Sequence, residues 1–160
     1  MLKKRYSLVL VCCAIAVFSS CNKGVIYQKY NKIPNNTWDM NAPMEFDIPI
    51  EDTVNRYNVY VNIRNDDGYD FSNLYLFIDI TAPNNATERD TMNCVLADNS
   101  GKWLGQGLGD IWDNKILFKF NTRFRKGNYK FKLTQAMRVD KLPEIMDVGI
   151  RIEQTPKNTN

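Results

Sequence analysis

Residues 57–64 read Tyr-Asn-Val-Tyr-Val-Asn-Ile-Arg, and this alternation of apolar and polar side chains decides the fold class. Successive side chains of an extended strand point to opposite faces, so every second residue from Tyr57 to Ile63 would lie on one face. The side chains between them, three of which are Asn or Arg, would lie on the other face. This pattern is typical of a β-strand that has one face in a core.

The same period of two recurs along the chain on both sides of this strand. We predict further strands at Met44–Ile50, Leu74–Ile80, Thr87–Leu96, Ile116–Asn121, Tyr129–Met137 and Val148–Ile152. Pro49 indicates that the first of these strands lies at a sheet edge or ends there. Several short strands without a long helical repeat favour an antiparallel β-sandwich. We therefore predict an all-β, single-domain antiparallel sandwich over residues 42–154, with a frayed tail at 155–160.

Turn-forming residues separate the predicted strands. Residues 65–68, Asn-Asp-Asp-Gly, are predicted to form a hairpin turn. Residues 125–128, Arg-Lys-Gly-Asn, would likewise join the strands around them into a hairpin spanning Ile116–Met137. Residues 142–146 are predicted to form one short helical turn.

The first 20 residues have the layout of an export signal. Three cations at residues 3–5 precede an apolar stretch of about 13 residues, which is too short for an ordinary membrane-spanning helix. Residues 18–21 then read Phe-Ser-Ser-Cys and resemble a relaxed bacterial lipobox. We predict a lipoprotein signal peptide at 1–20 and a lipid anchor on Cys21, the first residue of the mature protein. The alternative is an ordinary secretory signal with an incidental cysteine.

The remaining cysteines and the lack of histidine restrict the chemistry. Cys12 and Cys13 would leave with the signal, so Cys94 would be the one thiol without an assigned task. We expect it to be a small buried apolar residue. The chain has no His, which excludes a Ser-His-Asp triad, a Cys-His pair and His-ligated zinc.

The basic character of the whole chain comes from the signal. Removing residues 1–20 would remove three of the 21 Lys and Arg and none of the 18 Asp and Glu, leaving 18 of each sign. A neutral exported domain gives no reason to expect a nucleic-acid partner. Asn22 is not Asp, the residue associated with inner-membrane retention, so we expect an outer-membrane anchor with the domain facing the periplasm. Residues 21–41 are predicted as a tether and packing segment, irregular apart from a single edge strand.

Residues 103–113, Trp-Leu-Gly-Gln-Gly-Leu-Gly-Asp-Ile-Trp-Asp, form the most unusual stretch of the chain. The three alternating glycines lack the spacing of a phosphate loop or a dinucleotide fingerprint. They would permit positive φ or the close approach of another backbone. One interpretation is a bulged inter-strand loop with both tryptophans as core anchors. The other is a partner-binding loop whose candidate residues are Trp103, Gly105, Gly107, Gly109, Asp110 and Trp112.

Three further candidates have simpler explanations. The acidic group at residues 65–70 fails the EF-hand spacing for calcium, so no metal is predicted. Asp110 and Asp113 could pair like glycosidase carboxylates, but acidic pairs beside glycines are common. The basic residues between Lys115 and Lys132 fit the solvated face of a half-buried sheet, or else a docking surface for an acidic protein or glycan.

Taken together, these segments resemble the gliding-motility lipoprotein GldH family of Bacteroidota. The resemblance is carried by the lipobox, by strand sequences at 73–78 and 87–91, and above all by Gly-Gln-Gly-Leu-Gly-Asp-Ile at 105–111. It implies a lipoprotein associated with gliding and with the linked type IX secretion machinery, without enzymatic activity or a cofactor. Thr53 and Thr91 also resemble the three-residue O-glycosylation acceptor of that phylum.

Two hypotheses about function follow. The first is a non-catalytic, lipid-anchored sandwich that works through contacts with envelope proteins. The second is a lipid-anchored glycan-binding module that uses exposed aromatic side chains.

Overall fold

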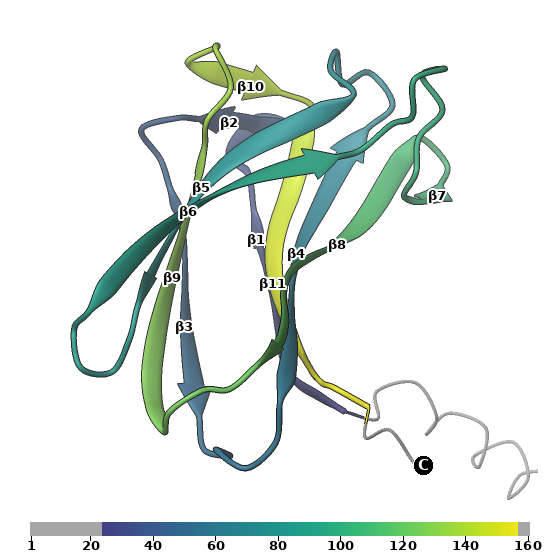
Figure 1. Ribbon diagram of the computed structural model, residues 1–160. Coiled ribbons are helices and arrows are strands. Elements are labelled where there is room, and N and C mark those ends of the chain that lie inside the picture. The colour runs from purple at the N-terminus through teal and green to yellow at the C-terminus, as the bar shows by residue number, and fades with distance from the viewer. Residues whose placement is uncertain (1–23, 157–160) are drawn as a thin grey trace, which may run out of the picture.

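The computed structural model describes residues 24–156, which form two facing β-sheets and a short third ladder (Figure 1). Every strand pairing is antiparallel. The predicted all-β antiparallel sandwich is therefore confirmed. The predicted signal peptide, the predicted lipid site at Cys21 and residues 157–160 of the predicted tail lie outside the described residues.

The larger sheet has five strands and the smaller has four. In spatial order, the larger contains β1 (Val25–Lys32), β11 (Ile145–Gln154), β4 (Tyr57–Asp66), β8 (Ile111–Thr122) and β7 (Gln106–Leu108). The smaller contains β3 (Met44–Ile50), β9 (Gly127–Gln135), β5 (Asn73–Thr81) and β6 (Thr87–Val95). A short ladder of β2 (Thr37–Asp39) and β10 (Lys141–Pro143) lies at one end, after the 3₁₀ turn η2 (Pro34–Asn36).

The core lies between the two sheets and follows the predicted period of two. On β4, every second residue from Tyr57 to Ile63 is fully buried. Phe46 and Ile48 on β3 face the core from the opposite sheet, as do Leu74 and Leu76 on β5. Removing such side chains from water is the main favourable term in folding, at about 1.5–3 kcal/mol each. The alternation read from the sequence thus sets which face of each strand points inward.

The edge strands on one side of the sandwich cover each other. β3 is an edge strand of the smaller sheet, as Pro49 predicted, and β1 is an edge strand of the larger sheet. The Asn31 side-chain amide on β1 donates a hydrogen bond of 2.9 Å to the Glu45 carbonyl on β3. The edge strand expected within residues 21–41 is therefore β1, which belongs to the sheet from Val25 onward.

The hairpin predicted around residues 65–68 is wrong, because β4 and β5 lie in different sheets. The chain does reverse at Asp67 and Gly68. It then carries Tyr69 into the core, where the Tyr69 hydroxyl donates a 3.0 Å hydrogen bond to the Asn73 carbonyl. Burial of this aromatic ring directs the chain across to the other layer, so the turn joins two sheets.

The predicted hairpin over Ile116–Met137 is also wrong. β8 pairs with β4 and β7, whereas β9 pairs with β3 and β5. The link between them buries Phe124, whose ring lies 6.1 Å from that of Tyr57 and 5.1 Å from that of Tyr129. Because this aromatic ring is buried between the sheets, the link carries the chain from one sheet to the other.

The helical turn predicted at residues 142–146 is not formed. Leu142 is buried in β10 opposite Trp38, and β11 begins at Ile145. Between them, Glu144 has a φ of +62°, in the left-handed region that a right-handed helical turn cannot include. Burial of Leu142 against the core favours a two-stranded ladder over the helix.

Candidate functional site

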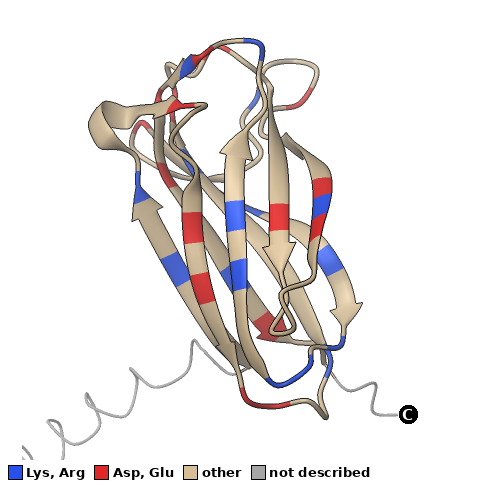
Figure 2. Ribbon diagram, turned by 90° about the vertical axis from the view of Figure 1, so that its left-hand side faces the viewer, with Lys and Arg blue, Asp and Glu red and all other residues tan. Residues whose placement is uncertain are grey.

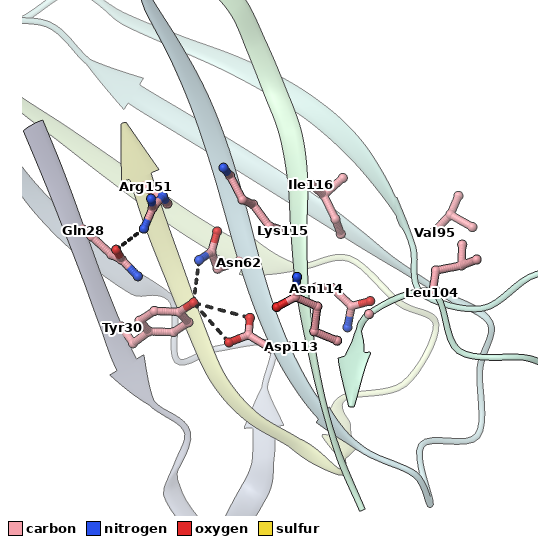
Figure 3. Close-up of a pocket in the computed structure, with 12 residues that line it drawn as sticks. Gln28, Tyr30, Asn62, Val95, Leu104, Asp113, Asn114, Lys115, Ile116 and Arg151 are labelled. Carbon is pink, nitrogen blue, oxygen red and sulfur yellow. Dashed lines mark hydrogen bonds between the residues drawn. The ribbon is translucent and has the colours of Figure 1, made fainter. Parts of the chain in front are cut away.

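The strongest candidate site is a cavity of about 440 Å³ on the outer face of the larger sheet, at the edge of β8 (Figure 3). Its walls differ in chemistry. One side is polar and carries Gln28, Tyr30, Asn62, Asp113, Lys115 and Arg151. The other side carries the apolar residues Val95, Leu104 and Ile116. Strands β1, β4, β8 and β11 therefore supply the polar side, and the segment before β7 helps to supply the apolar one.

A hydrogen-bonded network centred on Tyr30 organises the polar side. The Asn62 amide donates to the Tyr30 hydroxyl at 2.5 Å, and that hydroxyl lies 3.4 Å from a carboxylate oxygen of Asp113. Arg64 forms an ion pair with Asp113 at 3.0 Å and lies 4.4 Å above the Tyr30 ring. Burial opposes the charge of Arg64, but the hydrogen bond and negative charge of Asp113 outweigh it and raise the arginine pKa. The network holds Tyr30 in place over the sheet.

A second group of charges borders the first. Lys115 forms a 2.7 Å ion pair with Glu153 and lies 4.0 Å from the centre of the Tyr60 ring. Arg151 contacts the same carboxylate at 2.5 Å and also donates to the Gln28 amide oxygen. Burial would raise the pKa of Glu153, but its bonds to Lys115 and Arg151 lower it overall. The charges around the cavity thus largely balance.

Asn62 has one buried polar atom without a partner. The residue is 3 % exposed, and its side-chain oxygen makes no hydrogen bond to any described residue. Turning the amide over would not solve this, because oxygen and nitrogen would exchange places and the NH₂ group would then occupy the unpaired position. A buried, unpaired polar atom costs stability, so this position suits a ligand that supplies the missing hydrogen bond.

The glycine-rich stretch lies beside this cavity as a hairpin, not as the bulged loop that the sequence also allowed. β7 pairs with the start of β8, and Gly109 and Asp110 form the turn between them. Gly109 has a φ of +62°. A Cβ on Gly107 would lie 2.8 Å from the Trp112 ring, and one on Gly105 would lie 2.9 Å from the Asp113 carbonyl. The expectation that these glycines provide positive φ or close approach is confirmed.

Both tryptophans of this stretch are half-buried. Trp103 packs on the core, with its ring 6.5 Å from Tyr69 and 6.5 Å from Trp112. The predicted partner-binding group of Trp103, Gly105, Gly107, Gly109, Asp110 and Trp112 is thus spread over three places. Gly105 lines the cavity, Gly109 and Asp110 are exposed at the hairpin tip, and the tryptophans serve mainly in packing.

The other predicted positions are distributed over the surface or the core. Asp113 is committed to Arg64, so it does not stand with Asp110 as a free carboxylate pair. Within residues 24–156, no group of three or more potential ligands has metal-site geometry. Cys94 is fully buried, as expected, and burial raises its pKa to about 12. Thr53 and Thr91 are both exposed, on the β3–β4 link and on β6.

The basic residues between 115 and 132 are divided between the two sheets. Several are paired with acids: Lys115 with Glu153, Lys119 with Glu88 and Asp90, Lys126 with Glu51, and Lys130 with Glu45. Figure 2 shows the same intermixing of positive and negative residues on neighbouring strands. This arrangement fits a solvated surface better than a docking site for an acidic partner.

Sequence reasoning missed the residues that build the polar side, above all Tyr30, Asn62 and Arg64. Each occupies the polar face of a strand, where alternation alone indicates ordinary contact with solvent. One signal was available. Asn is disfavoured in strands, yet β4 carries Asn58 near its start and Asn62 in its middle, and both are buried.

These features define an antiparallel β-sandwich with a polar cavity at an open strand edge. Comparison with known proteins assigns the family. The family model described as GldH lipoprotein matches residues 25–152. The chain belongs to this family, and the resemblance seen in the sequence is confirmed.

Two relatives match over nearly their whole length. The gliding motility lipoprotein GldH of Flavobacterium johnsoniae is 35% identical over 153 residues, which cover 91% of this chain and 94% of that protein. A GldH homolog of Christiangramia forsetii is 33% identical over 162 residues, covering 96% and 99% respectively. Across residues 24–156, no helix has the length and apolar character of a membrane span.

Proposed function

We propose that this protein is a membrane-anchored envelope lipoprotein that contributes to gliding motility and the linked type IX secretion machinery through protein contacts. The observation that carries the proposal is the family match over residues 25–152, together with relatives of nearly equal length named for gliding motility. The lipid on Cys21 would hold the domain at the outer membrane, facing the periplasm. The proposal includes no enzymatic step.

The chemistry of the surface supports a role in binding. Asp113 is held by Arg64, and Cys94 is buried with a raised pKa, so neither group is poised for acid–base or nucleophilic work. β8, in contrast, exposes two large apolar side chains, with Leu117 47% and Phe120 68% exposed. Apolar side chains beside a polar rim are typical of protein-binding surfaces.

Deletion of the gene tests the proposal. We expect the deletion strain to lose surface spreading and to secrete less through the type IX system, and we expect the wild-type gene to restore both. Cells that lack the protein yet spread and secrete normally would refute the proposed function.

The glycan-binding alternative has less support, because it relied on Trp103 and Trp112 as exposed platforms. Their half-buried rings pack against each other, and Trp103 also packs on the core. A glycan array would decide between the two functions. Binding that is lost in both Trp103→Ala and Trp112→Ala proteins that remain folded would favour the module.

A further inference from the structure

We infer that the end of the sandwich where the chain enters binds the phosphate of an anionic phospholipid headgroup, in a cavity lined by Arg56 and Arg123. We call this cavity the two-arginine notch. It has a volume of about 210 Å³ and is formed by the β3–β4 link, the end of β8 and the segment after β11. The inference rests on the proposed lipid anchor. It deepens the proposed function, because it states how the anchored domain meets the membrane.

The two-arginine notch adjoins the point where the chain enters the larger sheet. Gly24 accepts a 2.7 Å hydrogen bond from the Gln154 amide, and the next residue, Thr155, lines the notch. The Thr155 amide donates a 2.8 Å hydrogen bond to the carbonyl of Arg56. The start of β1 therefore lies beside the end of β11 and beside the notch (Figure 1). A lipid on Cys21, three residues before Gly24, would place the notch close to the bilayer surface.

Both arginines keep their charge available for a ligand. They are exposed, and neither forms an ion pair with any residue between 24 and 156. Arg56 donates a 2.9 Å hydrogen bond to the Asn121 carbonyl, which fixes its guanidinium beside the notch. A guanidinium is planar, and its paired N–H groups match two oxygens of one phosphate. Cavities that hold whole small molecules measure roughly 300–1,000 Å³, so this smaller one suits a phosphate group.

Two acids lie in the connecting segments at this end, and both are held by other partners. Glu51 forms a 2.8 Å ion pair with Lys126. Asp52 accepts hydrogen bonds from the Val54 amide at 2.8 Å and from the Asn55 side chain at 2.5 Å. Neither carboxylate therefore pairs with an arginine of the notch.

An exposed apolar side chain borders the notch. Val54 is 81% exposed and lines the cavity. The hydrogen bond from its amide to Asp52 holds the turn that presents it. Binding to a membrane surface grows with the apolar area that enters the interface and with electrostatic attraction to anionic lipids. The notch offers both contributions side by side.

Charge is distributed unevenly between the two ends of the sandwich. The connecting segments at the notch end, 51–56, 82–86 and 123–126, carry four cations and two acids. The segments at the other end, 33–43, 67–72, 96–105, 109–110 and 136–144, carry three cations and seven acids. An anionic bilayer surface attracts the first end and repels the second. This complementarity selects an anionic lipid and orients the notch toward it.

A fluorescent label beside the notch tests the inference on the full-length lipoprotein. Thr53→Cys is labelled with the polarity-sensitive dye NBD, because Thr53 is exposed next to Val54 and Cys94 is fully buried. The labelled protein is reconstituted into vesicles of phosphatidylcholine, with or without phosphatidylglycerol. We expect the dye emission to shift to the blue when phosphatidylglycerol is present. Salt at about 1 M should reverse the shift, because it shortens the Debye length to about 3 Å.

Two double variants locate the contact. Arg56→Gln with Arg123→Gln should lower the ratio of docked to undocked protein about 25-fold, since each basic residue near an anionic surface contributes about fivefold. Lys102→Gln with Lys141→Gln removes the same charge at the other end and is the matched control. It should change the ratio by less than about twofold. Thermal unfolding checks that both variants fold, and the lipid and salt comparisons need neither.

Three results would overturn the inference. The first is a dye emission that is the same with and without phosphatidylglycerol, or equal effects of the two double variants. The second is a larger blue shift from a label at Ser100→Cys, which is exposed at the other end of the sandwich. The third is inorganic phosphate that raises the Tm in detergent while phosphatidylglycerol leaves the dye unchanged, because the notch would then hold a free anion.

The two proposals fail separately. Normal spreading and secretion by the deletion strain would refute the function and leave the dye shift intact. A dye emission that does not respond to phosphatidylglycerol would refute the two-arginine notch and leave the function standing.

Discussion

Replacing Gly149 with alanine should disturb the network on the outer face of the larger sheet. Gly149 is buried on β11, between Tyr30 on β1 and Asn62 on β4. A Cβ at this position would lie 2.8 Å from the Lys29 carbonyl oxygen and 3.0 Å from Cδ1 of Tyr30. The carbonyl belongs to a paired strand and cannot move easily, so we expect the tyrosine ring to shift as well.

The magnitude follows from three contributions. Overpacking costs about 1–3 kcal/mol. Weakening the hydrogen bonds of the Tyr30 hydroxyl adds about 1 kcal/mol. Replacing glycine also restricts the unfolded chain, which stabilises the fold by about 0.4–1 kcal/mol. The free energy of unfolding should therefore fall by about 1–3 kcal/mol, which lowers the Tm by about 4–12 °C for a domain of this size.

Thermal unfolding followed by circular dichroism measures this change. Gly68→Ala is the matched control, because its Cβ would make only an ordinary contact, 3.5 Å from the Asp66 carboxylate. It should leave the Tm unchanged or slightly raised. A double-mutant cycle with Tyr30→Phe reports on the network. Removing the hydroxyl should cost about 1 kcal/mol in the wild type and less in Gly149→Ala.

An unchanged or higher Tm for Gly149→Ala would refute this account of the close approach. A lower Tm with no coupling to Tyr30→Phe would be explained by the contact with the Lys29 carbonyl alone. It would refute the displacement of Tyr30.

Three further predictions concern the anchor, the core and a buried amide. Cys21→Ser should move the protein from the membrane fraction to the soluble fraction, because the acyl chains supply roughly 0.8 kcal/mol per buried CH₂; full membrane retention would contradict the anchor. Stability should fall as the pH rises from 9 toward 12, by up to about 1.4 kcal/mol per unit for Cys94, because the thiol ionises near 9 in the unfolded chain and at about 12 in the fold. Urea titrations between pH 8 and 10.5 on wild type and Cys94→Ala would show this, and identical pH dependence would refute it. Asn114→Ala should cost about 1–3 kcal/mol, because it leaves the Asn65 side-chain oxygen, 2.9 Å away and buried, without its donor; an unchanged urea midpoint would contradict that role.

The strands were predictable because alternation is a local property. The buried faces of β3, β4 and β5 follow directly from residues such as Phe46, Val61 and Leu76. Assignment of strands to sheets was not predictable in this way. Residues 65–68 and 125–128 look like hairpin turns, but Tyr69 and Phe124 enter the core beside them and carry the chain across. An aromatic residue directly beside a turn is the signal that alternation alone ignores.

The candidate site was predictable only in part. The glycines at 105–109 were recognised as positions of close approach or positive φ, and the structure shows both. Tyr30, Asn62 and Arg64 come from strands far apart in sequence, so their proximity depends on the order of β1, β11 and β4 in the sheet. No local pattern contains that order.

The position of β1 limits how far the domain can stand from the bilayer. β1 begins at Val25, and Gly24 accepts a 2.7 Å hydrogen bond from the Gln154 amide. With the lipid on Cys21, only three residues precede the sheet, and four Cα-to-Cα steps span at most about 14 Å. A ten-residue strand is about 34 Å long. The proposed anchor would therefore hold the end of the sandwich where β1 starts within about 14 Å of the bilayer surface, with the β7 hairpin at the end remote from it (Figure 1).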